Sequence, residues 1–146
     1  MNKPIQWNET CLTLLDQRKL PTEAVYITCR SWQAVGDAIR DMVVRGAPAI
    51  GIAAAYGFVL GVRSIEGELH VSALDEIRSG LMSTRPTAVN LGWALDRMYA
   101  YANDHKDDDN WLVLLEALAR RIEDEDREMC AQMGRHGADF LGELKQ

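Results

Sequence analysis

The chain has 146 residues, 47% of them hydrophobic and 26% charged, with a formal net charge of −6. This length and composition fit one domain with a real core and exclude a disordered chain. The three cysteines have no C-x-x-C spacing, which excludes a disulfide scaffold and indicates reduced thiols in a cytoplasmic protein. The acidic balance argues against nucleic acid as a partner, because phosphate backbones need clustered cations.

Residues 1–30 are predicted to form a small antiparallel β meander. Three short runs, at 5–7, 11–15 and 25–29, alternate in polarity or are rich in β-branched and aromatic side chains. Turn-forming residues separate these runs.

From Ser31 onward the apolar spacing becomes helical, so residues 31–146 are predicted to form a helical bundle. Ser31 can cap the first helix, Pro48 lies at the expected first position of the second, Pro86 opens the fourth, and the last begins after Asn110. The predicted fold class is therefore mainly α with a small N-terminal antiparallel β-sheet (α+β).

The expected helices each have an apolar face. The positions predicted to face the core are Val35, Ala38, Ile39, Met42 and Val43 in the first helix, Leu74, Ile77 and Leu81 in the third, Ala88, Leu91, Leu95, Met98 and Ala102 in the fourth, and Leu112, Leu115, Ala119 and Ile122 in the last, with Met129, Met133, Phe140 and Leu144 extending that last face. The run 104–110 predicts a solvated loop, and glycines weaken the last helix near its end.

Residues 46–62 carry no charge and are predicted to form a central helix buried on all sides. A membrane span needs about 20 apolar residues, and this stretch is shorter and is closed tightly by Arg45 and Arg63. Small residues such as Gly57 and Gly61 allow neighbouring helices to approach closely. We therefore expect no membrane segment, and the N-terminus lacks a secretory signal.

Several residues of catalytic type have simpler explanations. Cys130 and His136 fall on different sides of a helix, so they do not pair locally as nucleophile and base. Asp37 and Asp41 are better explained by an exposed polar face than as a carboxylate pair. The histidines have no metal-ligand spacing, so no metal is predicted.

Residues 45–51 and 83–90 share a design that suits an anion. In each, an arginine precedes a proline that can start a helix, and a helix N-terminus offers unpaired N–H groups and about half a positive charge. Gly46 lets the backbone come close to a ligand. Each arginine taken singly more often faces water, so a helical domain with no ligand stays an alternative.

Residues 41–57, DMVVRGAPAIGIAAAYG, resemble the hallmark of methylthioribose-1-phosphate isomerases. Residues 83–91, STRPTAVNL, and 14–21, LLDQRKLP, resemble the same family, with the motifs in the family's order over essentially the whole chain. The wider family includes ribose-1,5-bisphosphate isomerases and the regulatory subunits of translation initiation factor 2B, whose resemblance is weaker in these stretches.

The resemblance implies an enzyme of methionine salvage, a route of methionine biosynthesis. It converts 5-methylthioribose 1-phosphate to 5-methylthioribulose 1-phosphate, an aldose–ketose isomerisation, without a cofactor. It also implies a helical N-terminal domain packed on a Rossmann-like C-terminal domain, with the substrate in the cleft between them. Arg45, Gly46, Ala47 and Arg85 match substrate-binding positions of the family.

The family's catalytic cysteine and aspartate belong to the C-terminal domain, before which this chain ends. We therefore expect no catalytic residue here, Cys130 included, and an N-terminal domain that is inactive alone. Its expected partners are the substrate, the missing Rossmann-like C-terminal domain and a second copy in a homodimer. The alternative is a non-catalytic regulatory or binding module related to the initiation factor 2B subunits.

Overall fold

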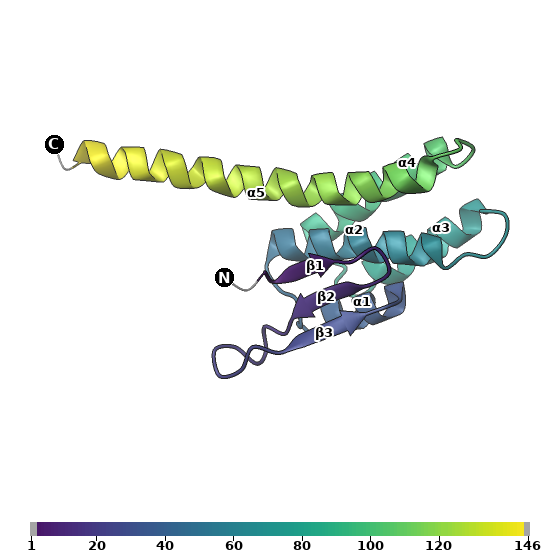
Figure 1. The fold of residues 1–146 in the computed structure, drawn as a ribbon, viewed down its shortest axis with the longest axis horizontal. Helices are drawn as coiled ribbons and strands as arrows, with labels where there is room; N and C mark the ends of the chain where they lie inside the picture. Colours follow the sequence, from purple (N-terminus) through teal and green to yellow (C-terminus); the bar gives the residue numbers. More distant parts are fainter. Residues whose placement is uncertain (1–2, 145–146) are drawn as a thin grey trace.

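The computed structural model describes residues 3–144, which begin with a small sheet (Figure 1). Its strands are β1 (Ile5–Trp7), β2 (Leu12–Leu15) and β3 (Tyr26–Cys29), in the order β1-β2-β3 with both pairs antiparallel. The expected antiparallel sheet is confirmed, with its second and third strands beginning one residue later than predicted.

Five helices follow in the described part of the chain: α1 (Trp32–Arg40), α2 (Ala47–Arg63), α3 (Val71–Met82), α4 (Val89–His105) and α5 (Trp111–Leu144). The mainly α prediction is therefore confirmed. Ser31 caps α1 as expected, since its Oγ accepts the N–H of Ala34 at 3.1 Å. None of the helices in residues 3–144 is both long enough and apolar enough to cross a membrane.

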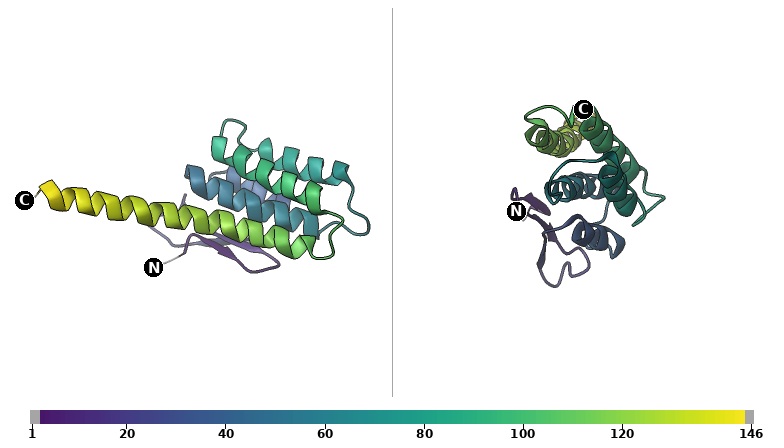
Figure 2. Two further views of the ribbon diagram at one scale, coloured as in Figure 1. Left: turned by 90° about the horizontal axis from the view of Figure 1, so that it is seen from above. Right: turned by 90° about the vertical axis from the view of Figure 1, so that its right-hand side faces the viewer.

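Helix α2 is the centre of the molecule. All its residues from Ile50 to Val62 are buried, and it contacts the other four helices and the strands β1 and β2. Figure 2 shows α2 enclosed by these elements in the view along the bundle. Two glycines permit the close packing, because a Cβ at Gly57 or Gly61 would come within 2.9 Å of the side chains of Val35 and Ile77, respectively.

Helix α1 is shorter than its apolar spacing predicted. It ends at Arg40, and Met42 has a left-handed backbone with φ +62° and a side chain that is 44% exposed, so its prediction as a core residue was wrong. The N–H groups of Met42 and Val43 donate to the carbonyl groups of Ile39 and Ala38, which is a Schellman ending of the helix. Glycine usually occupies the left-handed position of this motif, so a methionine there did not indicate that the helix ends.

Helix α4 starts later and ends later than predicted. It begins at Val89, and Pro86 lies in the turn before it, so the proline does not open the helix. The helix runs to His105, into the segment predicted as a solvated loop. A stacked contact between the rings of Tyr101 and His105, whose centroids lie 4.1 Å apart, accompanies this extension by two residues.

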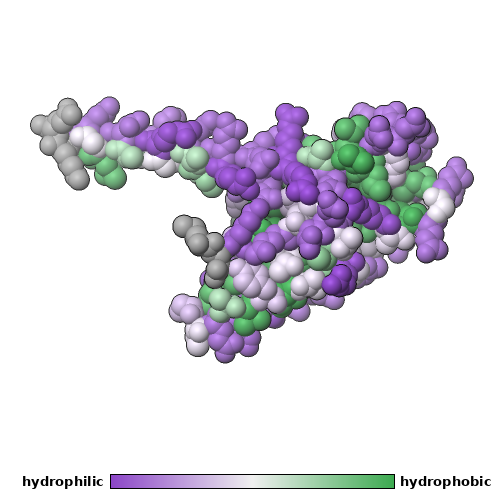
Figure 3. Space-filling view, in the orientation of Figure 1, coloured by the Kyte–Doolittle hydropathy of each residue, from purple (hydrophilic) through white to green (hydrophobic). Residues whose placement is uncertain are grey.

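Helix α5 continues past the bundle for about half its length (Figures 1 and 2). Its first half packs on the core through Leu115, Ala119 and Ile122. The prediction that later residues extend this core face was wrong, because Met129, Met133, Phe140 and Leu144 are all more than half exposed. Figure 3 shows hydrophobic residues along the underside of this projecting part. Its glycines do not end the helix before Leu144.

A polar cluster fastens α5 to the sheet and to α2. The indole of Trp7 stacks on the ring of Tyr56, with centroids 4.8 Å apart, and donates to the carboxylate of Glu116 at 2.8 Å. Glu116 also forms an ion pair with Arg63 at the end of α2, and the buried Tyr56 hydroxyl donates to Glu123 of α5. One residue of β1, two of α2 and two of α5 thus meet in a single network.

Candidate anion-binding site

The loop that holds Arg45 leads directly into the N-terminus of α2. Gly46 is the residue before the helix, with φ +99°, and no side chain caps the helix start. Ala47 is the first helical residue and Pro48 the second, one position later than predicted. Since proline has no N–H, the free donors at this end come from its neighbours, of which Gly46 and Ala47 are exposed.

The loop that holds Arg85 leads into α4 in a similar way. The N–H of Ala88 donates to the carbonyl of Arg85 at 3.0 Å, which closes the turn, and no side chain caps the helix. Thr84 anchors the turn from below, because its buried hydroxyl donates to the carbonyl of Leu81 at 2.6 Å. Both loops therefore present uncapped helix starts beside an arginine.

The two helix starts lie side by side because α2 and α4 run parallel and touch at this end. A Cβ on Gly51 would come within 2.9 Å of the carbonyl oxygen of Asn90, so only glycine permits this approach. As a result, Arg45 and Arg85 line the same hollow, of about 530 Å³. Its full lining is Met42, Arg45, Gly46, Ala47, Ile50, Arg85, Thr87, Ala88, Val89 and Asn90.

The electrostatics of this hollow favour an anion. It contains two guanidinium groups and the positive ends of two helices, each worth about half an elementary charge. Arg45 is exposed and Arg85 is half-buried, and neither forms an ion pair with an acidic side chain of residues 3–144. Forked guanidinium groups and free N–H groups together match the oxygen atoms of a phosphate.

The same hollow offers little for acid–base chemistry. The described residues that line it include no carboxylate, histidine or cysteine. Cys130 is exposed on α5, and Cys11 and Cys29 are buried by the sheet. Within residues 3–144 no three metal-ligating side chains come together. The arrangement can therefore hold an oxyanion but does not itself provide a proton donor and acceptor.

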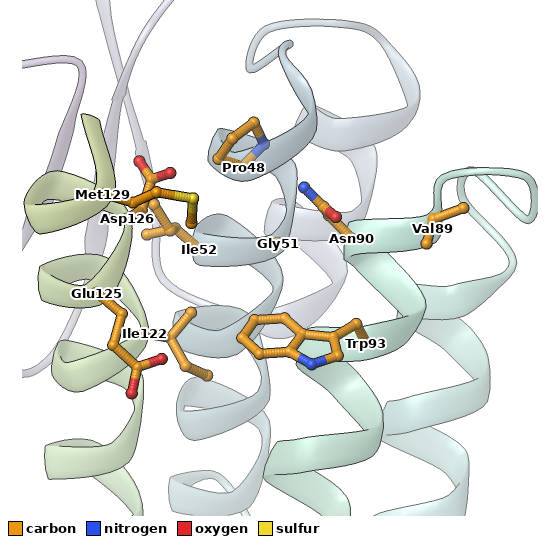
Figure 4. Close-up of a pocket in the computed structure, with 10 residues that line it drawn as sticks. All are labelled: Pro48, Gly51, Ile52, Val89, Asn90, Trp93, Ile122, Glu125, Asp126 and Met129. Carbon is orange, nitrogen blue, oxygen red and sulfur yellow. The ribbon is translucent and has the colours of Figure 1, made fainter. Parts of the chain in front are cut away.

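A second hollow, of about 400 Å³, adjoins the first between α2, α4 and α5. The two share Val89 and Asn90. Figure 4 shows the indole of Trp93 reaching from α4 toward Ile122 of α5, with Met129 above them. Sequence reasoning did not predict this hollow, because it depends on how α5 crosses the two parallel helices. The one local signal that could have pointed to it is Trp93, which lies three residues after Asn90 on the same helix.

Glu125, one of the two acidic residues of α5 that line this second hollow, forms ion pairs with arginines. Arg97 of α4 donates to the Glu125 carboxylate at 2.6 and 3.0 Å and lies over the ring of Trp93. The hydrogen bonds from Arg97 are the main cause that holds the pKa of Glu125 below its ordinary value, and they outweigh the opposing effect of burial.

Asp37, which the sequence predicted to lie on an exposed polar face, forms an ion pair with Arg40 of the same helix at 2.6 Å.

The fold and the hollow define the class of this protein as a mainly helical domain with a cationic hollow at two helix starts. The chain belongs to the initiation factor 2 subunit family, whose model matches residues 43–145. Curated relatives carry a more particular name. The methylthioribose-1-phosphate isomerase of Geotalea uraniireducens (strain Rf4) is 44% identical over 146 residues, covering 97% of this chain and 42% of that protein.

Other relatives and two solved structures agree with this similarity. The methylthioribose-1-phosphate isomerase of Stutzerimonas stutzeri (strain A1501) is 49% identical over 141 residues, covering 95% of this chain and 39% of that protein. The structure of 5-methylthioribose 1-phosphate isomerase from Pyrococcus horikoshii OT3 superposes with a TM-score of 0.87 at 35% identity, covering 95% of this chain and 40% of that one. The initiation factor eIF-2B subunit delta from A. fulgidus superposes with a TM-score of 0.79 at 35% identity, covering 88% and 38%.

The chain thus spans about two fifths of the length of the curated relatives that it matches. The resemblance seen in the sequence motifs is confirmed, and so is the match to a helical N-terminal domain of this family.

Proposed function

We propose that this chain forms the phosphate-binding wall of the active site of a methylthioribose-1-phosphate isomerase. Arg45 and Arg85 bind the phosphate of 5-methylthioribose 1-phosphate with their guanidinium groups, and Gly46 and Ala47 offer backbone N–H groups from the start of α2. The observation that carries the proposal is the single hollow that both arginines line. The names of the relatives supply the substrate.

The reaction itself needs more than this wall. Turning the aldose into the ketose moves a hydrogen between C1 and C2 of the sugar, which requires a positioned acid and base in a closed site. The described lining of the hollow contains neither. We therefore propose that a further domain, of the kind that makes the relatives longer, covers the hollow and supplies both groups, and that the 146-residue chain alone does not isomerise the substrate.

Kinetics of the complete gene product test the phosphate-binding role. A hydrogen-bonded charge contributes about 1.5–3 kcal/mol, so Arg45→Ala and Arg85→Ala should each lower kcat/KM by roughly 10- to 150-fold. The matched control is Arg78→Ala, which removes a partly exposed arginine that pairs with Asp96 on the bundle surface. Unchanged kcat/KM in both site variants would refute the proposal, and turnover by the 146-residue chain would refute its inactivity.

A non-catalytic module is the second candidate. The observation in its favour is the superposition on the initiation factor subunit from A. fulgidus, at a TM-score of 0.79. The downstream reading frame distinguishes the two. A continuation that carries a cysteine after a strand, and later an aspartate, supports the isomerase, whereas a stop codon at this point of the native gene supports the module.

A further inference from the structure

The turn after β2 contains a buried carboxylate that the proposed function does not use. Asp16 is only 1% exposed, yet it accepts three hydrogen bonds from one residue. The backbone N–H of Arg18 donates to Oδ1 at 3.0 Å, its Nε to Oδ1 at 2.9 Å and its Nη2 to Oδ2 at 2.8 Å. These side-chain hydrogen bonds are the largest cause that lowers the pKa of Asp16, against the opposing effect of burial.

This carboxylate fixes the peptide between Asp16 and Arg18. An aspartate that accepts the N–H two residues ahead forms an Asx turn, which restricts the residue between them. On the other side, the N–H of Asp16 donates to the carbonyl of Val25 at 2.7 Å. The N–H of Gln17 is therefore held in one direction, and it donates to the carbonyl of Val43 at 2.9 Å.

The segment that receives this hydrogen bond is strained and leads to the anion site. Met42, next to Val43, has φ +62°, a conformation that costs a non-glycine residue about 1–2 kcal/mol. Its side chain lines the hollow together with Arg45, two residues beyond Val43. A strained backbone persists only where its surroundings hold it, and such strain is typical of ligand-binding segments.

We propose that Asp16 is a positioning residue for the anion site, holding residues 42–46 in their binding shape through Arg18 and the Gln17–Val43 hydrogen bond. This inference rests on the proposed function, because it assumes that Arg45 binds the phosphate. Asp16 itself does not line the hollow. Its effect on the ligand is therefore transmitted through the backbone, and removing it should disturb the Arg45 loop before it disturbs the rest of the bundle.

The first test follows the loop itself, in the 146-residue chain, by amide hydrogen exchange. In Asp16→Ala, exchange at the hydrogen-bonded amides of Gln17, Val43 and Val44 should accelerate at least tenfold, while the central amides of α2 keep their rates. Asp16→Asn retains an oxygen for the Arg18 N–H and should restore most of the protection. Equal acceleration throughout the bundle, or none at the loop, overturns the proposal. If Asp16→Ala does not fold, Arg18→Ala takes its place; it removes the two side-chain hydrogen bonds to Asp16 but keeps the backbone one, so a smaller acceleration is expected at the same amides.

The second test measures function in the complete gene product. Asp16→Ala should raise KM about tenfold with kcat changed less than threefold, Asp16→Asn should recover most of that loss, and Arg78→Ala should match the parent enzyme. A fall of kcat and enzyme stability with KM unchanged would show that Asp16 only supports the fold. If Arg45→Ala and Arg85→Ala both leave kcat/KM unchanged, the proposed function fails, and the exchange experiment still decides whether Asp16 orders the loop.

Discussion

The contact between Gly51 and Asn90 brings the two helix starts together, and Gly51→Ala tests it directly. The new Cβ would come within 2.9 Å of the Asn90 carbonyl oxygen, 3.4 Å of its carbon and 3.5 Å of the Cβ of Ala94. The first two atoms are backbone, so they can move only if α4 moves. Because α4 packs against α2, the helices must separate at the end where the hollow lies.

Two opposing effects set the magnitude. Replacing glycine by alanine inside a helix gains about 1 kcal/mol of helix propensity, while forcing a methyl group into a packed contact costs about 1–3 kcal/mol. Gly92→Ala isolates the second effect, because Gly92 is likewise a helical glycine at this end of the bundle, in α4, but its Cβ would meet only the flexible tip of Met82, at 3.5 Å. We expect Gly51→Ala to be less stable than Gly92→Ala by about 1–3 kcal/mol.

Urea denaturation followed by circular dichroism measures this difference, with the midpoint and slope compared between the two variants and the parent chain. Gly51→Ala should also weaken phosphate binding, since it moves the two helix starts apart, whereas Gly92→Ala should not. Equal stability of the two variants would show that α2 and α4 do not approach as closely as described. The convergence of the two arginine loops would then lose its structural basis.

Three further changes give sharp expectations. Met42→Gly relieves the strain of the left-handed backbone and should raise the free energy of unfolding by up to about 1 kcal/mol in thermal or urea denaturation. A lower free energy of unfolding would contradict the Schellman ending. Tyr56→Phe removes the buried hydroxyl that donates to Glu123 and should lower the free energy of unfolding by about 1.5–3 kcal/mol, measured the same way. An unchanged stability would contradict that hydrogen bond. Burial opposes ionisation of Glu116, but hydrogen bonds from Trp7 and Arg120 and the charge of Arg63 outweigh it and lower its pKa below 4.5. The ionised carboxylate therefore stabilises the fold above pH 4.5, and this stabilisation is lost as the pH falls through the lowered pKa. At pH 7, Glu116→Gln should be less stable than the parent by about 1–3 kcal/mol. This difference in stability should disappear in acid. A gap that does not depend on pH would contradict the assignment.

The features that sequence predicted well are those with a local physical cause. Residues 46–62 were predicted as a buried helix because they lack charge. Ser31 was predicted as a cap because a serine hydroxyl can accept a free N–H of the first helical turn, here that of Ala34. The ends of helices were less predictable where the usual residue is missing. Met42 ends α1 in a conformation that normally requires glycine, and Pro86 precedes α4 without starting it.

The candidate site was predictable only in its parts. Each arginine loop could be recognised from an arginine, a proline and a helix start, since these are neighbours in the chain. The convergence of the two loops could not be predicted, because it depends on a contact between Gly51 and Asn90 across two helices.

The exposed apolar residues of α5 were wrongly predicted to face the core for a related reason. Their helical spacing is real, but whether a face is covered depends on what lies beside it.

The central claim, that one phosphate group is held between the two arginine loops, is tested most directly by a crystal structure of the complete gene product with 5-methylthioribose 1-phosphate. The account predicts phosphate oxygens within hydrogen-bond distance of both Arg45 and Arg85 and of an N–H at the start of α2. A phosphate bound elsewhere, or held by other residues while both arginines face solvent, would contradict it.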